Sequence, residues 1–175
     1  GREDMADAVL AEIRKIAGHG SGPCAYSVPR KTYIGAKWIR HAGWYPDATI
    51  RLFEKTKGRF SASLVHERVV VDGEVGRCVG HLLHYSFAGV TDLFRKIAQY
   101  SEASALQMFA QGRRCGRLEL VLRPILAFLK SYLWKLGFLD GWEGLAIAAS
   151  TFVAVFRKYA KLRDLYEAGN GERPA

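Results

Sequence analysis

The run Gly43-Trp44-Tyr45-Pro46-Asp47-Ala48-Thr49-Ile50-Arg51-Leu52-Phe53 carries the strongest signal for a fold and a site in this chain. Its second part is rich in β-branched and large apolar residues, and it predicts a strand over 50–53. This strand carries Arg51, with the carboxylate of Asp47 before it and that of Glu67 after it. A guanidinium between two carboxylates predicts one wall of a site for a polar, negatively charged ligand.

The composition predicts one globular domain, or a piece of a larger one, with anionic partners. The chain has 175 residues, 49% of them hydrophobic, which is enough for a core and far from the composition of a disordered segment. Its 26 Lys and Arg exceed its 17 Asp and Glu, and the net charge of +9 favours phospholipid head groups, nucleotide phosphates or nucleic acid. The charge is distributed and the sequence contains no recognised basic motif, so we expect no nucleic-acid partner.

The cysteines and the first residues favour a cytosolic compartment. Cys24, Cys78 and Cys115 are odd in number and widely spaced, so the sequence supports neither a disulfide framework nor a zinc ribbon. The first residues contain no basic segment leading into an apolar stretch, so we expect no signal peptide. A start without Met indicates a fragment or a processed chain.

The character of the sequence changes near residue 90. Before it, short stretches predict a helix over 5–17 and strands over about 25–30, 50–53, 68–71 and 80–85, with a turn at 72–73. After it, helical periodicity predicts helices over 90–110 and 118–136, and an apolar run follows over 145–156. We therefore expect an α/β fold, or α+β as a fragment, with a short mixed sheet followed by amphipathic C-terminal helices. Residues 169–175 resemble a flexible tail.

Two apolar segments of the second part fit the surface of a membrane. Residues 118–136 are almost wholly apolar, with Glu119, Arg123 and Lys130 on one helical face. The run 145–156 is shorter than the roughly 20 residues needed to span a bilayer, so we do not expect it to span one. Burial as a pair of core helices is the alternative. The aromatic and cationic residues at the segment ends favour an anionic interface, and they are Tyr132, Trp134, Lys135, Trp142, Arg157, Lys158, Lys161 and Arg163.

The opening run also offers groups that can contact a sugar or its phosphates. Trp44 and Tyr45 can form a platform for a sugar ring, and a place in the core is the alternative. Because its neighbours in the strand are apolar, Arg51 needs an anionic partner. That partner is either a phosphate or carboxylate of the ligand, or the carboxylate of Asp47 or Glu67 in a structural ion pair. If these two carboxylates do not belong to a site, Asp47 is a turn residue after Pro46 and Glu67 is a surface carboxylate.

The histidines of this half do not form a metal site by their spacing. His81 and His84 are three residues apart, so on a strand they point to opposite faces and cannot chelate one ion. His84 alone can lend one ligand to a metal held mainly by other residues, or it hydrogen-bonds in the core or to the ligand. His66, beside Glu67, is a candidate substrate contact.

The order of these motifs resembles the acceptor half of a bacterial family 2 glycosyltransferase, of the kind that acts in lipopolysaccharide core or related glycan synthesis. The resemblance runs over about 6–166 and rests on Trp-Tyr-Pro-Asp, Arg-Leu-Phe, His-Glu, His-Tyr, Leu-Asp-Gly and a basic helical end. It implies a GT-A-like fold, with 1–90 as the acceptor side of the catalytic domain and 91–168 as a membrane-interfacial helical region. Such enzymes carry an Asp-x-Asp motif in a preceding nucleotide-sugar half, and this sequence has no such motif, so we expect that half upstream.

The resemblance implies an inverting transfer of a sugar from a nucleotide-sugar donor to a glycan or lipid-linked acceptor, at the cytoplasmic face of the cell membrane. Glu67 is then the preferred catalytic base and Asp47 the competing one. Arg51 helps to fix the site or the diphosphate, and Trp44 and Tyr45 shape the acceptor pocket. Mg²⁺ or Mn²⁺ is expected for the complete enzyme, and this chain alone is expected to be inactive. The alternative is a non-catalytic, membrane-associated binding or scaffold domain derived from such an enzyme.

Overall fold

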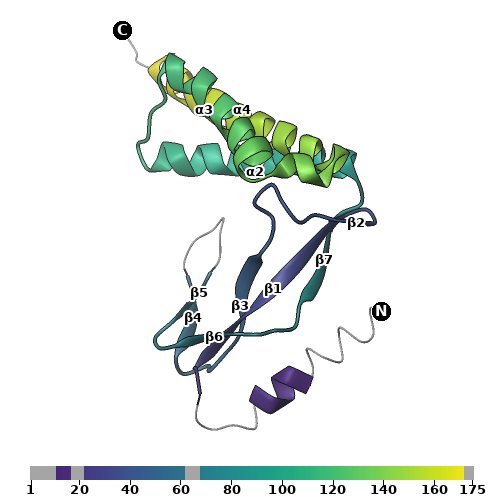
Figure 1. The fold of residues 1–175 in the computed structure, drawn as a ribbon. Coiled ribbons are helices and arrows are strands. Elements are labelled where there is room, and N and C mark those ends of the chain that lie inside the picture. The colour runs from purple at the N-terminus through teal and green to yellow at the C-terminus, as the bar shows by residue number, and fades with distance from the viewer. Residues whose placement is uncertain (1–10, 17–21, 62–67, 172–175) are drawn as a thin grey trace. The chain divides into compact units, whose positions relative to one another are not determined.

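A computed structural model describes residues 11–16, 22–61 and 68–171, which fall into two compact units (Figure 1). One unit comprises Gly1–Tyr33 and Trp44–Tyr85, and the other comprises Ile34–Gly43 and Ser86–Ala175. The segment 34–43 therefore belongs with the helices, although it lies in the strand-rich half of the sequence. The division into parts at residues 90 and 168 that the sequence suggested stays a prediction.

The first unit is built around the long strand β1 (Ala25–Ile34). β3 (Asp47–Phe53) pairs with it antiparallel, β6 (Val75–Arg77) pairs with it parallel, and β7 (Leu82–Phe87) pairs with it as well. A separate antiparallel pair consists of β4 (Gly58–Phe60) and β5 (Val69–Val71). Residues 11–16 are helical, as expected for the described part of 5–17. The sheet is thus short and mixed, as predicted.

The second unit consists of β2 (Lys37–Trp38) and three long helices, α2 (Val90–Ala110), α3 (Arg117–Leu129) and α4 (Trp142–Gly171). α4 packs against both α2 and α3. Apolar side chains at helical spacing provide this packing, and Met108, Tyr159 and Leu162 form a buried cluster. The mixed class with C-terminal helices is therefore confirmed.

Glycines and backbone turns set the ends of these helices. α2 ends where Gly112 takes a φ of +68°, a conformation that favours glycine. α3 begins after Gly116, whose N–H donates to the Glu119 carboxylate at 3.0 Å. The predicted helix over 118–136 is wrong in its second part, because a π-helical turn (Lys130–Trp134) follows α3 and Leu136 then adopts a φ of +55°.

A 3₁₀ turn (Gly137–Asp140) completes the link to α4 and packs closely on it. A Cβ added to Gly144 would lie only 1.8 Å from the Gly137 carbonyl oxygen, so glycine is required at this approach. The apolar run 145–156 lies inside α4. Within the described ranges, no helix combines the length and the apolar character needed to cross a membrane.

Candidate functional site

The first cluster of predicted site residues lies at the beginning of β3. Asp47 is the cross-strand partner of Arg30 on β1, and the Arg30 guanidinium donates to the Asp47 carboxylate. Both side chains are partly shielded from water, at 21% and 38% exposed. Asp47 is therefore a strand residue held by an arginine that the sequence did not single out, rather than a turn residue or the partner of Arg51.

Arg51 lies in the middle of the same strand. Its side chain is exposed, whereas the flanking Ile50 and Leu52 are half-buried. Because water reaches the guanidinium, the fold does not require a structural partner for it. The side chain is accessible to a soluble anion.

Tyr45 contacts the segment that precedes β7. Its hydroxyl lies 3.0 Å from His81 Nε2, and the two rings stack with centroids 6.1 Å apart. Burial lowers the pKa of His81, and the nearby cations Lys31 and Arg77 lower it further. A neutral imidazole can accept a hydrogen bond from the tyrosine hydroxyl at Nε2, so this contact orients the Tyr45 ring. Trp44, the residue before Tyr45, is half-buried.

Of the remaining predicted site residues, His84 is on β7, and the other two lie outside the described residues. Glu67 and His66 lie outside the described residues, so their roles stay predictions. His84 is exposed on β7. In residues 11–16, 22–61 and 68–171, no group of three or more His, Cys, Asp or Glu side chains fits a metal ion.

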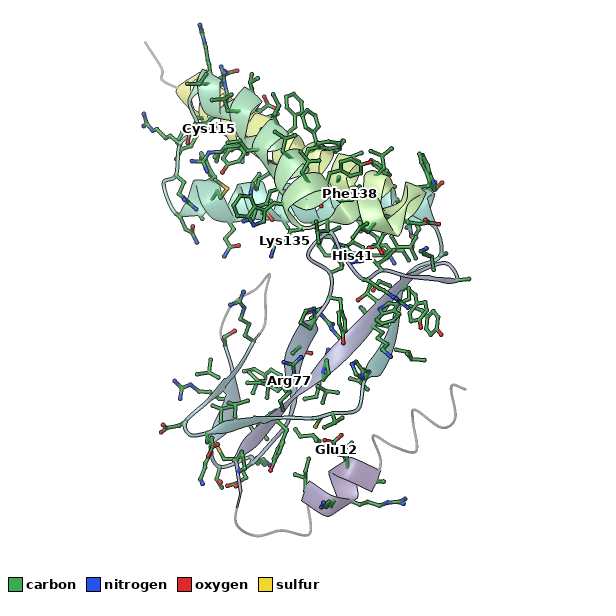
Figure 2. The ribbon with its side chains drawn as sticks, viewed as in Figure 1. Glu12, His41, Arg77, Cys115, Lys135 and Phe138 are labelled. Atoms are coloured by element: carbon green, nitrogen blue, oxygen red, sulfur yellow. The ribbon has the colours of Figure 1, made fainter. Side chains whose placement is uncertain are left out.

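A buried carboxylate that the sequence did not single out as a site residue lies in the second unit. Asp140, 3% exposed, accepts hydrogen bonds from the backbone N–H groups of Arg40 at 3.1 Å and His41 at 2.7 Å. His41 Nδ1 lies 3.1 Å from the other carboxylate oxygen. His41 lies beside the segment that carries Lys135 and Phe138, and the Ala42 N–H donates to the Lys135 carbonyl at 2.8 Å (Figure 2). Asp140 thus fixes the backbone and one imidazole nitrogen of the 40–41 loop.

A cavity of about 470 Å³ lies over this loop. The guanidinium of Arg40 lies 4.4 Å from the centre of the Trp38 ring, and Lys37 contributes a second cation to the lining. An aromatic face, two cations and an oriented imidazole suit a polar or anionic ligand. In the sequence, this site is marked only by the acidic residue in Leu139-Asp140-Gly141. Its hydrogen-bond partners lie 99 and 100 residues away, so local sequence patterns could not identify them.

Curated glycosyltransferases are similar to this chain. It is 31% identical over 120 residues to the lipopolysaccharide core biosynthesis glycosyltransferase LpsC of Rhizobium meliloti, covering 63% of this chain and 44% of that protein. It is 28% identical over 124 residues to an uncharacterized glycosyltransferase of Rickettsia prowazekii, covering 66% and 42%, and 28% identical over 125 residues to one of Rickettsia typhi, covering 66% and 43%. No family model matches the chain, and no solved structure matches it.

These relatives confirm the resemblance to bacterial glycosyltransferases, and one of the three is named for lipopolysaccharide core synthesis. The chain spans less than half the length of each of the three. Assignment to family 2 and to the GT-A fold stays a prediction.

Proposed function

We propose that this chain is the acceptor-side part of an inverting glycosyltransferase that transfers a sugar from a nucleotide-sugar donor to a glycan or lipid-linked acceptor. The similarity to three glycosyltransferases carries the proposal, because it covers nearly two thirds of the chain. A GT-A-like fold and membership of family 2 belong to the same proposal. The short mixed sheet with the Tyr45, Asp47 and Arg51 motif supports it.

In the proposed reaction, an acceptor hydroxyl oxygen attacks the anomeric carbon of the donor sugar. The bond from that carbon to the diphosphate oxygen breaks, and a carboxylate takes the hydroxyl proton. Glu67 is the proposed base, with Asp47 as the alternative. Exposed Arg51 would stabilise the negative charge of the departing diphosphate, and the Trp44 and Tyr45 rings would contact the acceptor sugar. His66 and His84 are further proposed substrate contacts.

A divalent cation such as Mg²⁺ or Mn²⁺ would neutralise the diphosphate in the complete enzyme. We propose that its carboxylate ligands belong to a nucleotide-sugar half outside this chain. The roles assigned to residues of this chain do not depend on it.

The proposed place of action is an anionic membrane surface at the cytoplasmic side. The outer side of α3 and the turn after it expose a continuous apolar stripe at helical spacing, in which Leu118 is 70% and Leu126 60% exposed. Trp134, 83% exposed, lies between Lys130 and Lys135 at the end of this stripe. We call it the apolar face of α3; its members are Leu118, Val121, Leu122, Ile125, Leu126, Leu129, Leu133 and Leu136.

The test uses the protein as its host makes it, incubated with a panel of nucleotide sugars and lipopolysaccharide core acceptors. Release of nucleoside diphosphate that depends on the acceptor is the expected result. Glu67→Gln should abolish turnover and leave donor binding intact, because only the base is lost. Arg59→Gln, an exposed change on β4, is the control that should leave turnover unchanged.

Three outcomes would count against parts of this proposal. Turnover retained by Glu67→Gln and lost in Asp47→Asn would move the base to Asp47. Donor binding without any acceptor-dependent release would favour a non-catalytic binding domain. Unchanged sedimentation with anionic vesicles after Leu126→Glu, which places a charge in the apolar face of α3, would reject the membrane contact.

A further inference from the structure

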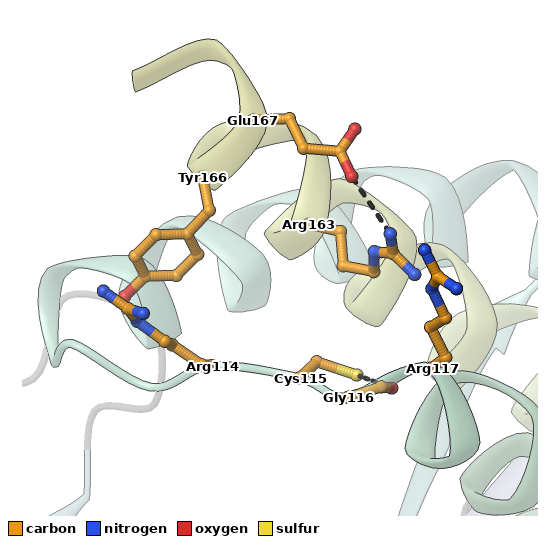
Figure 3. A pocket seen from close by; sticks show the side chains of 7 residues that line it. All are labelled: Arg114, Cys115, Gly116, Arg117, Arg163, Tyr166 and Glu167. Carbon is orange, nitrogen blue, oxygen red and sulfur yellow. Dashed lines mark hydrogen bonds and ion pairs between the residues drawn. The ribbon is translucent and has the colours of Figure 1, made fainter. Parts of the chain in front are cut away.

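A basic pocket lies where the turn after α2, the beginning of α3 and the last turns of α4 meet. It has a volume of about 280 Å³, and its lining holds three arginines and one glutamate. Figure 3 shows Arg114 and the Tyr166 ring on one side of the pocket and Arg117 and Arg163 on the other. Three guanidinium groups around one small cavity create a site with an excess of positive charge.

The positive charge in this pocket is only partly neutralised by the protein. Arg163 donates to Glu167 at 3.0 Å, and the Arg114 guanidinium lies 5.2 Å from the centre of the Tyr166 ring. In the part of the chain that the structure describes, Arg114 and Arg117 take part in no ion pair. Planar guanidinium groups bind phosphate oxygens through paired hydrogen bonds, so a phosphate is the anion that fits this lining.

The surroundings reinforce this preference for an anion. Arg117 is the first residue of α3, where the positive end of the helix dipole lies. Burial lowers the pKa of Lys158 on α4, and repulsion from Arg123 and Arg113 lowers it further. Lys158 does not line the pocket, so it adds positive charge to the α3 and α4 pair rather than to the site itself.

A second, apolar groove follows the same two helices. Ile125 and Phe128 of α3 and Ala149, Phe152 and Val153 of α4 line about 370 Å³ of space. Arg117 and Ile125 are roughly 12 Å apart along the α3 axis, at a rise of about 1.5 Å per residue. That separation matches the distance from a lipid phosphate to the upper part of its acyl chain.

We propose that the α3 and α4 pair binds one anionic lipid, with its phosphate in the Arg114, Arg117 and Arg163 pocket and an acyl chain along the apolar groove. The inference deepens the proposed membrane contact and rests on it, because a vesicle or membrane supplies the lipid. Charge complementarity selects a phosphate, and the apolar groove on the same two helices, about 12 Å along α3 from Arg117, selects a phosphate that carries a hydrocarbon chain. A soluble phosphate compound shares the first feature and lacks the second.

The test measures co-sedimentation of the full protein with phosphatidylcholine vesicles that contain phosphatidic acid. A basic residue near an anionic surface contributes about 1 kcal/mol through general attraction, which corresponds to about a fivefold change in binding. The control double variant Arg59→Gln, Arg95→Gln removes two exposed arginines that do not line the pocket, and it should lose no more than about twenty-fivefold. The double variant Arg114→Gln, Arg117→Gln should lose at least about tenfold more than the control, because it removes direct phosphate contacts.

Two further arms distinguish the source of the phosphate. Ala149→Phe fills the groove without changing the charge, and it should weaken binding to these vesicles severalfold. Inorganic phosphate and glycerol 3-phosphate, which lack an acyl chain, should compete poorly with the vesicles. Far-ultraviolet circular dichroism of each variant shows whether the helices are retained. Arginine variants that lose them are replaced by lysine substitutions, which keep the charge and lose the paired hydrogen bonds, and Ala149→Phe is replaced by Ala149→Leu.

Equal losses in the Arg114→Gln, Arg117→Gln variant and in the Arg59→Gln, Arg95→Gln control would overturn the proposal, because they would show general surface attraction. Effective competition by glycerol 3-phosphate, or no effect of Ala149→Phe, would overturn the assignment to a lipid. No sugar donor is present in these experiments, so their outcome is independent of glycosyl transfer. A protein that transfers sugar normally and shows none of these differences would refute the lipid site alone.

Discussion

Replacing Asp140 by Ala should destabilise the second unit by about 2–4 kcal/mol, because each backbone N–H left without its acceptor costs about 1–3 kcal/mol. Two such donors, those of Arg40 and His41, depend on this carboxylate. The lower part of the range applies to Arg40, whose side chain is exposed and whose N–H water can partly reach. The measurement is urea denaturation followed by tryptophan fluorescence, with Trp38 as a reporter next to the loop.

Asp140→Asn should cost only about 1 kcal/mol, because the amide keeps one good acceptor and loses mainly the contribution of charge. Its oxygen can take the position that accepts both backbone N–H groups. Its NH₂ then faces His41 Nδ1, which can accept a hydrogen bond in the other neutral tautomer. The nitrogen chemical shifts of His41 should therefore report a change of tautomer.

Asp164→Asn, a change at an exposed carboxylate on α4, is the matched control and should shift stability by no more than about 0.5 kcal/mol. If Asp140→Ala unfolds at the same urea concentration as the control, the carboxylate does not hold the 40–41 loop. If Asn costs as much as Ala, the negative charge rather than the acceptor geometry stabilises the loop.

Three further changes test other parts of the structure. The lowered pKa of His81 means that the folded state favours its neutral form. The free energy of unfolding should therefore fall as the pH drops below the ordinary pKa of 6.5, and His81→Gln should flatten this dependence in denaturation curves. Gly144→Ala should destabilise by about 3 kcal/mol because its Cβ meets the Gly137 carbonyl, whereas Gly89→Ala, with open space around it, should be nearly neutral by thermal denaturation. Arg30→Met should cost only about 1 kcal/mol in urea denaturation, because it removes the more buried guanidinium together with the ion pair and leaves only Asp47, which is 38% exposed, without this partner.

The sequence predicted elements well where a long pattern lay between clear breaks. The helix over 90–110 has the predicted bounds, because helical periodicity continues from Gly89 to Gly112. The strands β2, β4 and β6 are two or three residues long, too short to show alternation, and they were missed. The end of α3 was placed too late because the apolar pattern continues through the π-helical turn.

The candidate site was predicted in its residue types and less well in its contacts. The opening run identified Tyr45 and Asp47 but not their partners. Asp47 meets Arg30 through the register of β1 and β3, and Tyr45 meets His81, which lies 36 residues further along the chain. The attachment of the 40–41 loop to Asp140 was equally invisible, since only the folded chain brings them together. Local patterns report which side chains are available, whereas register and packing decide which of them meet.

The Arg30 ion pair bears on which carboxylate is the better candidate for the proposed base. A catalytic base must take up the acceptor proton and become neutral during the reaction. In the structure the Asp47 carboxylate accepts a hydrogen bond from the guanidinium of Arg30, which is only 21% exposed. This contact with the neighbouring strand suits Asp47 to fixing β3 against β1 and makes its carboxylate less available to an acceptor hydroxyl. The proposed base is therefore better assigned to Glu67, and a protein with Arg30→Met should show whether release of Asp47 from this contact changes the rate of transfer.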